Sequence, residues 1–295
     1  MKKLFGQGAA HHKFGELIRR KQPIVDPVQF EPKWKVAKNL PRGRNCRWCG
    51  FATFDDEHII LAGGQDENYN TSNEVTLMNL KTGKCTELPP MIKARYECSA
   101  IVVNRILFIF GGHNRDGSLK HVEMLDLSDY VSSSSSSSSY NQRQFVLLKN
   151  HPLPQPLLNA TLVADNGGNF IYVIGGGLEV NNGRPLKNTS VYRFNVATYE
   201  WFTLPSMNVE RQGAMAVLWK EYLIVLGGYC CYRDGDVYFS SIETLRLRDT
   251  HQDRENDEPS SSSSWKLVDR ANFLPEARAD GFAFLLGDGQ LILAG

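Results

Sequence analysis

Cysteine and histidine are the residue types in this sequence that could hold a metal, and their spacing argues against a metal site. Cys46 and Cys49 form one Cys-x-x-Cys pair, whereas a structural zinc site needs a second pair of ligands. Cys230 and Cys231 are adjacent in the chain. The histidines of the central region fall on different predicted elements: His58, His113, His121 and His151. We therefore expect packing cysteines, no bound metal and no cofactor.

The motifs of nucleophilic and nucleotide chemistry are also missing from the sequence. It has no Gly-x-Ser-x-Gly elbow. Gly6-Gln7-Gly8 lacks the third glycine of a dinucleotide-binding loop, and the glycines at 175–177 follow a strand pattern without opening a helix. We therefore expect no catalytic residue, and a protein that is not an enzyme.

Glycine pairs, by contrast, recur along the chain, each after an apolar run. They are Gly63-Gly64, Gly111-Gly112, Gly175-Gly176 and Gly227-Gly228, with Ala294-Gly295 as a fifth, altered copy. The position 16 residues before each pair is occupied by Arg47, Arg95, Asn159, Arg211 and Arg278 in turn. The recurrence of this fixed offset indicates a repeat array. Without the insertions that lengthen two of the units, each unit has about 50 residues.

Each unit is predicted to be a four-stranded antiparallel sheet. The strands, a to d, are joined by a short polar turn, a polar loop after the glycine pair, and a second turn that begins with Asn or Asp. The units are expected at about 47–91, 95–153, 159–207, 211–275 and 278–295, the last incomplete. Serine-rich loops at 128–144 and 249–264 lengthen two units and are predicted to be disordered.

The charge distribution separates the beginning of the chain from the rest. Net charge is +1, which excludes an electrostatic nucleic-acid binder, but residues 1–47 carry 12 Lys and Arg against 3 Asp and Glu. We expect residues 1–33 to be a basic, mostly disordered segment. A strand starting at Trp34 would join the array that spans 34–295. Because no apolar run is long enough to span a bilayer and no secretory signal is recognisable, we expect a cytoplasmic location, with the nucleus as an alternative.

These units resemble the kelch family. The resemblance lies in the glycine pair after strand b, the acidic or amide residue closing strand c (Asn79, Asp126, Asn195), Trp201 six residues later, and the Leu-Pro exits. It implies an all-β, kelch-type β-propeller of four-stranded blades around a channel. Five blades are visible and the last one is incomplete, so we expect a fragment of a five-bladed or, preferably, a six-bladed ring that is open or imperfectly closed. Cys85 replaces the tryptophan in the first unit and Asn159 replaces the arginine in the third.

In a four-stranded meander the b–c loops and the d–a linkers lie at the same end of the sheet. The polar and aromatic residues of these loops are therefore predicted to form a partner-binding face: Tyr69, His113, Arg115, Asp116, Arg184, Tyr229, Tyr232, Arg233 and Asp234. We expect the column arginines Arg47, Arg95, Arg211 and Arg278 to surround the channel mouth at the same end. The alternative is a structural role, in which they bond carbonyls of the neighbouring blade.

The resemblance implies a non-catalytic scaffold or substrate-receptor module with a protein partner, such as a ubiquitin-ligase or cytoskeletal component. The alternative is a carbohydrate-active enzyme of the oxidase or sialic-acid mutarotase type, because some relatives with this fold act on sugars. That alternative requires acids, histidines or tyrosines that converge near the channel.

Overall fold

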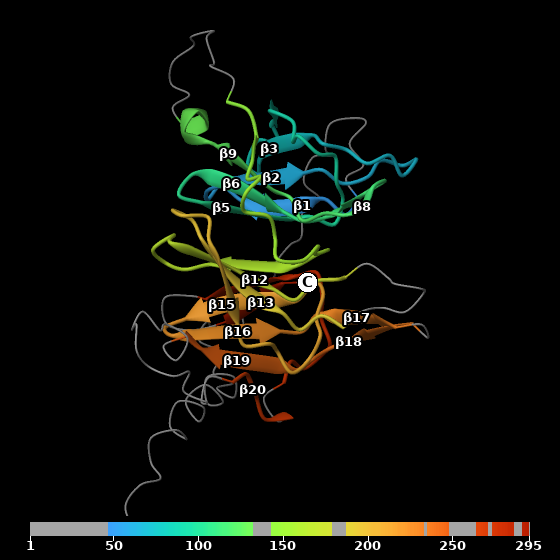
Figure 1. Cartoon of the computed structure of the whole chain (residues 1–295), viewed down its shortest axis with the longest axis vertical. Coiled ribbons are helices and arrows are strands. Elements are labelled where there is room, and N and C mark those ends of the chain that lie inside the picture. Colours follow the sequence, from blue (N-terminus) through green and yellow to red (C-terminus); the bar gives the residue numbers. More distant parts are fainter. Residues whose placement is uncertain are drawn as a thin grey trace, which may run out of the picture.

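The protein is built from small antiparallel sheets, each formed from one stretch of chain (Figure 1). This computed structural model describes residues 47–131, 143–178, 187–232, 235–247, 264–270, 273–285 and 291–294. The predicted basic segment 1–33, the strand expected at Trp34 and most of both serine-rich loops lie outside the described residues. No helix in the described part of the chain has the length and apolar character needed to cross a bilayer.

The described residues form five blades, in which the strands are ordered as they are in the chain. Blade one contains β1 (Gly50–Thr53), β2 (His58–Ala62), β3 (Val75–Asn79) and β4 (Cys85–Leu88). Blade two contains β5 (Ser99–Val103), β6 (Ile106–Phe110), β9 (Val122–Asp126) and β10 (Val146–Leu147). Blade three contains β11 (Thr161–Ala164), β12 (Phe170–Ile174), β13 (Val191–Asn195) and β14 (Trp201–Leu204). Blade four contains β15 (Met215–Trp219), β16 (Tyr222–Leu226), β19 (Ile242–Arg246) and β20 (Lys266–Leu267). Blade five contains β21 (Phe282–Leu285) and β22 (Leu291–Ala294).

The first strands of the blades pack against one another and make this set of sheets a propeller. β1 contacts β5, β5 contacts β11, β11 contacts β15 and β15 contacts β21. The rings of Phe51 and Phe282 lie 4.8 Å apart, so blades one and five also meet, through side chains. The predicted all-β propeller with an incomplete fifth blade is thereby confirmed, and its first and fifth inner strands are in contact.

Burial on both faces explains why the second strand of each blade is apolar, apart from His58 at the start of β2. In β6, Leu107 and Ile109 belong to the core shared with blade one, whereas Phe108 and Phe110 belong to the core shared with blade three. A strand with one face in water would alternate between apolar and polar residues. The unbroken apolar runs therefore mark strands enclosed between two neighbouring blades.

The glycine pairs join each blade to the next. The second glycine donates its N–H to a carbonyl at the start of the following blade: Gly64 to Arg95 at 2.8 Å and Gly112 to Leu157 at 2.9 Å. The first glycine lies under the same carbonyl, and a Cβ on Gly111 would sit 2.3 Å from the Leu157 oxygen. Both glycines adopt left-handed backbone conformations, with φ of 60° for Gly111 and 93° for Gly112. The recurring Gly-Gly is therefore required by the contact between blades.

Counting back a fixed 16 residues misaligned two of the expected arginine positions. By the contacts of the glycine pairs, Leu157 corresponds to Arg95, where Asn159 was predicted. The reason is the a–b turn, which spans residues 165–169 in blade three and residues 104–105 in blade two. Arg47 is likewise displaced by one position and corresponds to Tyr96, because Gly64 packs under the Arg47 carbonyl as Gly112 does under that of Tyr96.

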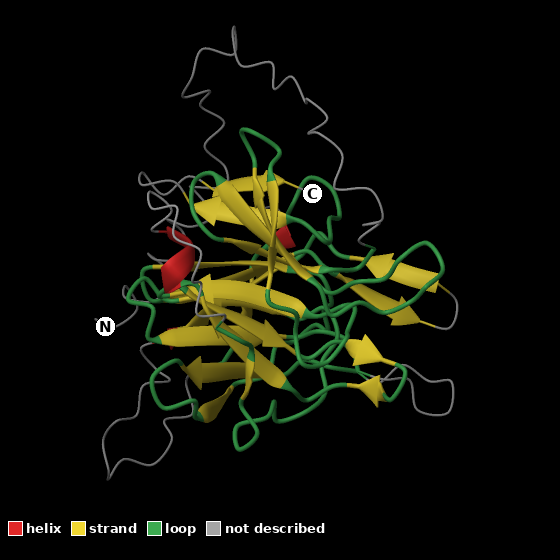
Figure 2. Ribbon diagram, turned by 90° about the horizontal axis from the view of Figure 1, so that it is seen from above, coloured by secondary structure: helices red, strands yellow, loops and turns green. Residues whose placement is uncertain are grey.

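Two additional hairpins extend the b–c loops on one side of the molecule. They are β7 (His113–Asn114) with β8 (Gly117–Ser118), and β17 (Tyr229–Tyr232) with β18 (Gly235–Tyr238). The short helix η1 (Ser128–Val131), which follows a c strand, lies on the opposite side (Figures 1 and 2). The predicted division of the loops between two ends of the blades is therefore correct for the described residues.

Candidate binding site at the channel mouth

Five residues at the start of the inner strands form a collar around the channel. They are Trp48, Glu97, Asn159, Gly213 and Asp280, one from each blade. Each N–H along this series donates to the carbonyl of the preceding member: Glu97 to Trp48 at 2.7 Å, Asn159 to Glu97 at 2.8 Å, Gly213 to Asn159 at 3.2 Å and Asp280 to Gly213 at 2.8 Å. The collar is therefore a continuous chain of backbone hydrogen bonds from blade one to blade five.

All five collar residues adopt the left-handed backbone conformation, with φ between 47° and 53°. For residues such as Trp48 and Glu97 this conformation costs on the order of 1–3 kcal/mol each, so surrounding contacts must enforce it. The hydrogen bonds between neighbouring members provide that constraint. Because the backbone is the same at all five positions, the chemistry of the mouth depends on which side chain each blade supplies.

The collar borders a cavity of about 460 Å³ that is lined by the inner strands of all five blades. The Asp280 carboxylate lies above Gly213, where a Cβ would come within 2.1 Å of its Oδ1 atom. The same Oδ1 accepts a hydrogen bond of 2.9 Å from Nδ2 of Asn159. The glycine in blade four thus leaves room for the carboxylate of blade five, which the amide of blade three holds in place.

The electrostatic environment of the mouth acts on Glu97 and on Tyr229. Burial raises the pKa of Glu97, repulsion from Asp280 raises it further, and the neighbouring His113 opposes the shift. Burial likewise raises the pKa of Tyr229 to about 12, against a hydrogen bond with Asn159, and Asp280 and Glu97 add to the increase. The mouth is therefore an acidic, partly desolvated environment in which Tyr229 stays a neutral phenol at ordinary pH.

Aromatic rings lie along the outer edge of the collar. Trp48 is 53% exposed and its ring lies 6.2 Å from that of Tyr96. The Tyr96 ring in turn lies 5.3 Å from the imidazole of His113, with which it forms a β-bridge. A ligand entering the cavity would thus pass an exposed indole beside a row of rings.

The column arginines Arg95 and Arg211 do not surround the channel mouth, contrary to the prediction. Both side chains are buried, with 0% and 1% exposure. Arg211 donates to the carbonyls of Gly227 at 2.5 Å and Ser241 at 3.1 Å, and its Nη2 lies 3.1 Å from Oε1 of Glu243. A guanidinium enclosed by carbonyls and a carboxylate cannot contact a partner, so the role of these two arginines is structural.

The buried arginines bond carbonyls of their own blades. The structural alternative predicts bonds to carbonyls of the neighbouring blade and differs from the structure in that detail. Arg95 repeats the pattern with the Gly111 carbonyl, at 2.8 Å, and with the Glu123 carboxylate. Glu123 also accepts the backbone N–H groups of Ile92 and Lys93 at 2.7 and 3.1 Å. Each Arg–Glu pair therefore fastens the linker that enters the blade to the third strand of that blade.

Blade three also supplies a side-chain donor to its glycine carbonyl, but it does so with different residues. Leu157 replaces the arginine there, and Tyr192 occupies the place of the glutamate in the strand register. The buried amide of Asn188 donates to the carbonyls of Gly175 at 2.9 Å and Gly176 at 3.0 Å. The glycine carbonyl is thus satisfied in blade three as well, by a neutral donor from the b–c loop.

The described members of the predicted partner-binding face lie on the side of the collar, and their role in binding remains a prediction. Arg115 and Asp116 are exposed at the tip of the first hairpin. Tyr69, 59% exposed, has the Arg47 guanidinium 5.9 Å from its ring centre, so Arg47 lies outside the collar.

Tyr229 stacks on Tyr238 at 5.7 Å, and the Tyr232 hydroxyl donates to Glu210 at 2.5 Å. Arg278 is half-buried, with Nη2 3.4 Å from the Glu276 carboxylate. The remaining predicted site residues, Arg184, Arg233 and Asp234, lie outside the described residues.

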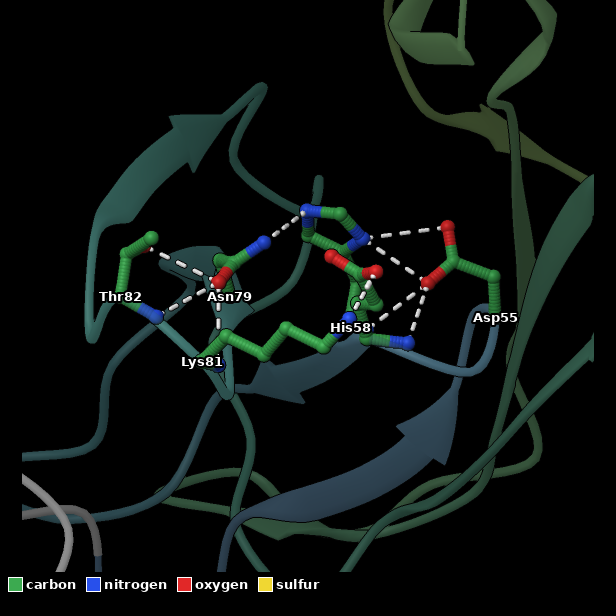
Figure 3. Close-up of polar contacts among 6 residues, drawn as sticks. Asp55, His58, Asn79, Lys81 and Thr82 are labelled. Atoms are coloured by element: carbon green, nitrogen blue, oxygen red, sulfur yellow. Dashed lines mark hydrogen bonds and ion pairs between the residues drawn. The ribbon is translucent and has the colours of Figure 1, made fainter.

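A second hollow, of about 880 Å³, lies on the outer side between blades one and two, and His58 and Asn79 border it. Figure 3 shows that the polar network there holds turns. Asp55 Oδ1 accepts the N–H groups of Glu57 and His58 at 2.8 Å each and lies 2.8 Å from Nδ1 of His58. Asn79 Oδ1 accepts the N–H of Thr82 at 2.8 Å. Because this network fastens the a–b and c–d turns, the channel mouth is the better candidate for a binding site.

Sequence reasoning missed Trp48, Glu97 and Asp280 as site residues. The signal available for them was their position two residues after the buried column, which is the same in every blade once the turns are aligned. That signal was hidden because the column itself was misaligned in blades one and three. In addition, a left-handed tryptophan or glutamate has no sequence signature of its own.

Comparison with known proteins agrees with this architecture. The Kelch motif model matches residues 94–131, which contain the first three strands of blade two, β5, β6 and β9. Kelch-like protein terF of Aspergillus terreus is 30% identical over 212 residues, which are 66% of this chain and 42% of that protein. Human Kelch-like protein 38 is 27% identical over 175 residues, 58% of this chain and 27% of that protein. The chain thus spans less than half the length of these relatives.

Among solved structures, that of YjhT superposes with a TM-score of 0.60 at 16% sequence identity, covering 88% of this chain and 74% of that one. At this identity the likeness concerns the fold. Together with the repeated glycine pairs and the radial four-stranded sheets, these matches show kelch repeats and the kelch β-propeller fold in this chain.

Proposed function

We propose that this protein is a non-catalytic interaction module that binds a protein partner through the side of the propeller formed by the collar and the b–c loops. The single observation that carries the proposal is the position of the exposed aromatic side chains. In the described part of the chain, the exposed tryptophan and tyrosines all lie on this side: Trp48, Tyr69, Tyr232 and Tyr238.

Tyrosine and tryptophan are the residues that most often dominate the binding energy of protein interfaces. Exposed aliphatic or phenylalanine side chains occur elsewhere, for example Val146 and Phe202 on outer strands, but singly. Isolated apolar residues on a surface are ordinary, whereas several aromatic residues on one face suggest contact with a partner. The kelch-like relatives are consistent with such a module. A ubiquitin-ligase or cytoskeletal partner and a cytoplasmic location remain proposals.

Variants of the full 295-residue chain test the proposal. Proteins captured from cells by the parent chain are compared by quantitative mass spectrometry with those captured by Tyr69→Ser/Tyr238→Ser. Val146→Ser/Phe202→Ser, which alters exposed apolar residues on outer strands, is the matched control. We expect the first variant to lose the main partners and the second to retain them, at unchanged melting temperatures. Retention by both variants would reject this face as the interaction surface.

The carbohydrate-active alternative has one specific observation in its favour, the convergence of Glu97 and Asp280 on the channel cavity. Among the described residues, no group of three or more His, Cys, Asp or Glu is arranged to hold a metal ion. The two functions separate in a direct assay. If the purified chain converts or epimerises a monosaccharide, and Glu97→Gln and Asp280→Asn abolish the turnover, the alternative holds.

A further inference from the structure

We infer that the channel mouth accepts a positively charged side chain of the partner, arginine or lysine, inserted between Glu97, Asp280 and the indole of Trp48. This inference rests on the proposed interaction function and specifies the chemistry of the partner segment.

The charges around the collar favour a cationic side chain. The nearby arginines are balanced within their own blades: Arg95 by Glu123, and Arg211 by Glu243. The Arg47 guanidinium is turned outward over Tyr69. The charges of the collar acids are therefore not cancelled by Arg47, Arg95 or Arg211, and the fourth column arginine, Arg278, has its Nη2 3.4 Å from the Glu276 carboxylate. They face a cavity of about 460 Å³, which falls within the usual range of about 300–1,000 Å³ for ligand pockets.

The aromatic edge of the collar also favours a cation. A cation close to an indole face gains about 0.5–1 kcal/mol when exposed and about 2 kcal/mol when desolvated. Trp48 is half-exposed, is held in a strained left-handed conformation by the collar, and lies next to Tyr96. An arginine can combine stacking on this ring with hydrogen bonds to a carboxylate, which is a combination that a neutral side chain lacks.

The Asp280 carboxylate is held in a fixed position. Its Oδ1 is held by Asn159 at 2.9 Å above Gly213. A carboxylate oriented in this way loses little conformational entropy when it binds a cation, so more of the interaction energy appears as affinity. An acidic segment would meet two like charges at the same place, which disfavours an anionic partner.

The test uses fluorescein-labelled Gly-Ser nonapeptides with three arginines, or with three citrullines, the uncharged isosteres of arginine. Anisotropy titrations with the full chain measure both affinities. We expect the arginine peptide to bind at least about tenfold more tightly than the citrulline peptide, which corresponds to about 1.4 kcal/mol. Equal affinities would overturn the inference. Displacement of the arginine peptide by a neutral monosaccharide, with equal citrulline binding, would overturn it in favour of a sugar site.

Variants of the collar residues show which side chains bind the arginine peptide. Glu97→Gln and Asp280→Asn should each weaken binding of the arginine peptide by about tenfold, whereas Glu87→Gln, an exposed acid on β4, should leave it unchanged. If a collar acid variant fails to fold, Trp48→Ala at an exposed position should still weaken binding several-fold. Unchanged affinity in Trp48→Ala and in the folded acid variants would contradict the inference.

The results separate this inference from the proposed function. Loss of cellular partners in Tyr69→Ser/Tyr238→Ser with no preference for arginine over citrulline would preserve the interaction module and reject the cationic side chain. A clear arginine preference with all cellular partners retained would do the reverse.

Discussion

Two positions at the start of each inner strand, only two residues apart, differ in burial and in role. In blade two, Arg95 is fully buried and bonds carbonyls and a glutamate of its own blade, whereas Glu97 borders the open cavity. The sequence alone suggests the opposite roles. A recurrent arginine is readily interpreted as a binding residue, whereas an acid that occurs in only some units attracts no interpretation. Recurrence in a repeat protein therefore marks what every blade needs, and variation marks what the molecule can use for recognition.

The two positions also differ in how much change they tolerate. At the buried position, the Arg–Glu pair of blades two and four is replaced in blade three by Leu157 together with Asn188, and the glycine carbonyl keeps its donor. At the collar, the residue type changes in every blade while φ stays between 47° and 53°. The buried position is restricted by the hydrogen bonds of its side chain, whereas the feature that all five collar positions share is their backbone conformation and the backbone hydrogen bonds between them.

The largest expected effect comes from removing a buried arginine. Arg211→Ala leaves the buried Glu243 carboxylate without its cationic partner and the Gly227 carbonyl without its side-chain donor, and breaking a buried pair of this kind typically costs about 3–5 kcal/mol. Urea unfolding measures the change. The control is Arg246→Ala, whose exposed pair with Glu221 is worth about 0–1 kcal/mol. Equal losses in the two variants would contradict the structural role of the column.

A glycine of the blade junction comes next. Gly111→Ala places a Cβ 2.3 Å from the Leu157 oxygen at a φ of 60°, and the left-handed backbone alone costs about 1–3 kcal/mol. Gly235→Ala is the control, because that glycine also has positive φ but its Cβ would meet nothing within 4 Å. We expect a clearly larger drop in unfolding free energy for Gly111→Ala. A similar drop in both would show that the contact between blades adds nothing.

In blade three the side chain that donates to the glycine carbonyl is the neutral amide of Asn188, so its removal tests the same position without an ion pair. Asn188→Ala removes the hydrogen bonds to the Gly175 and Gly176 carbonyls, and an unsatisfied buried acceptor costs about 1–3 kcal/mol. Asn188→Asp provides a second variant of similar size that lacks the donor. Denaturant unfolding should rank both below Arg211→Ala in severity. A neutral outcome for Asn188→Ala would mean that Asn188 does not replace the arginine.

The smallest expected effect is at the collar, and its sign is opposite. Burial and repulsion from Asp280 raise the pKa of Glu97, against the opposing influence of His113. The folded state then binds protons more tightly than the unfolded state, so this group lowers stability as pH rises through its folded pKa. Glu97→Gln should therefore raise the melting temperature at pH 7, by about 1–2 °C, and less at pH 4. A lower melting temperature at pH 7 would show that Glu97 supports the fold.

Much of the fold follows from sequence, because the features that encode it are local and repeated. The glycine pairs, the apolar second strands and the turn-opening residues predicted the blades. Asn79 and Asn195 do hold the c–d turns, accepting the Thr82 and Thr198 N–H groups at 2.8 and 3.0 Å. The assignment of loops to two ends of each blade followed from the antiparallel order of the strands.

The site was less predictable, for identifiable physical reasons. Asn159 and Asp280 lie 121 residues apart and meet only because the blades close around a channel. Turn lengths that differ between blades moved Arg47 and Asn159 out of register with Arg95. Whether an arginine points into a channel or into its own blade depends on a glutamate about 30 residues later, which a one-dimensional column does not reveal.

The most direct test measures stability and binding together in Arg211→Ala and in the double variant Glu97→Gln/Asp280→Asn. For each protein, urea unfolding and titration with the arginine peptide are carried out at pH 7. The structure predicts that Arg211→Ala loses unfolding free energy by about 3–5 kcal/mol. It predicts that the double collar variant is at least as stable as the parent and loses arginine binding. A collar variant that unfolds as readily as Arg211→Ala, or that still binds the peptide as tightly as the parent, would contradict the division between the buried column and the binding collar.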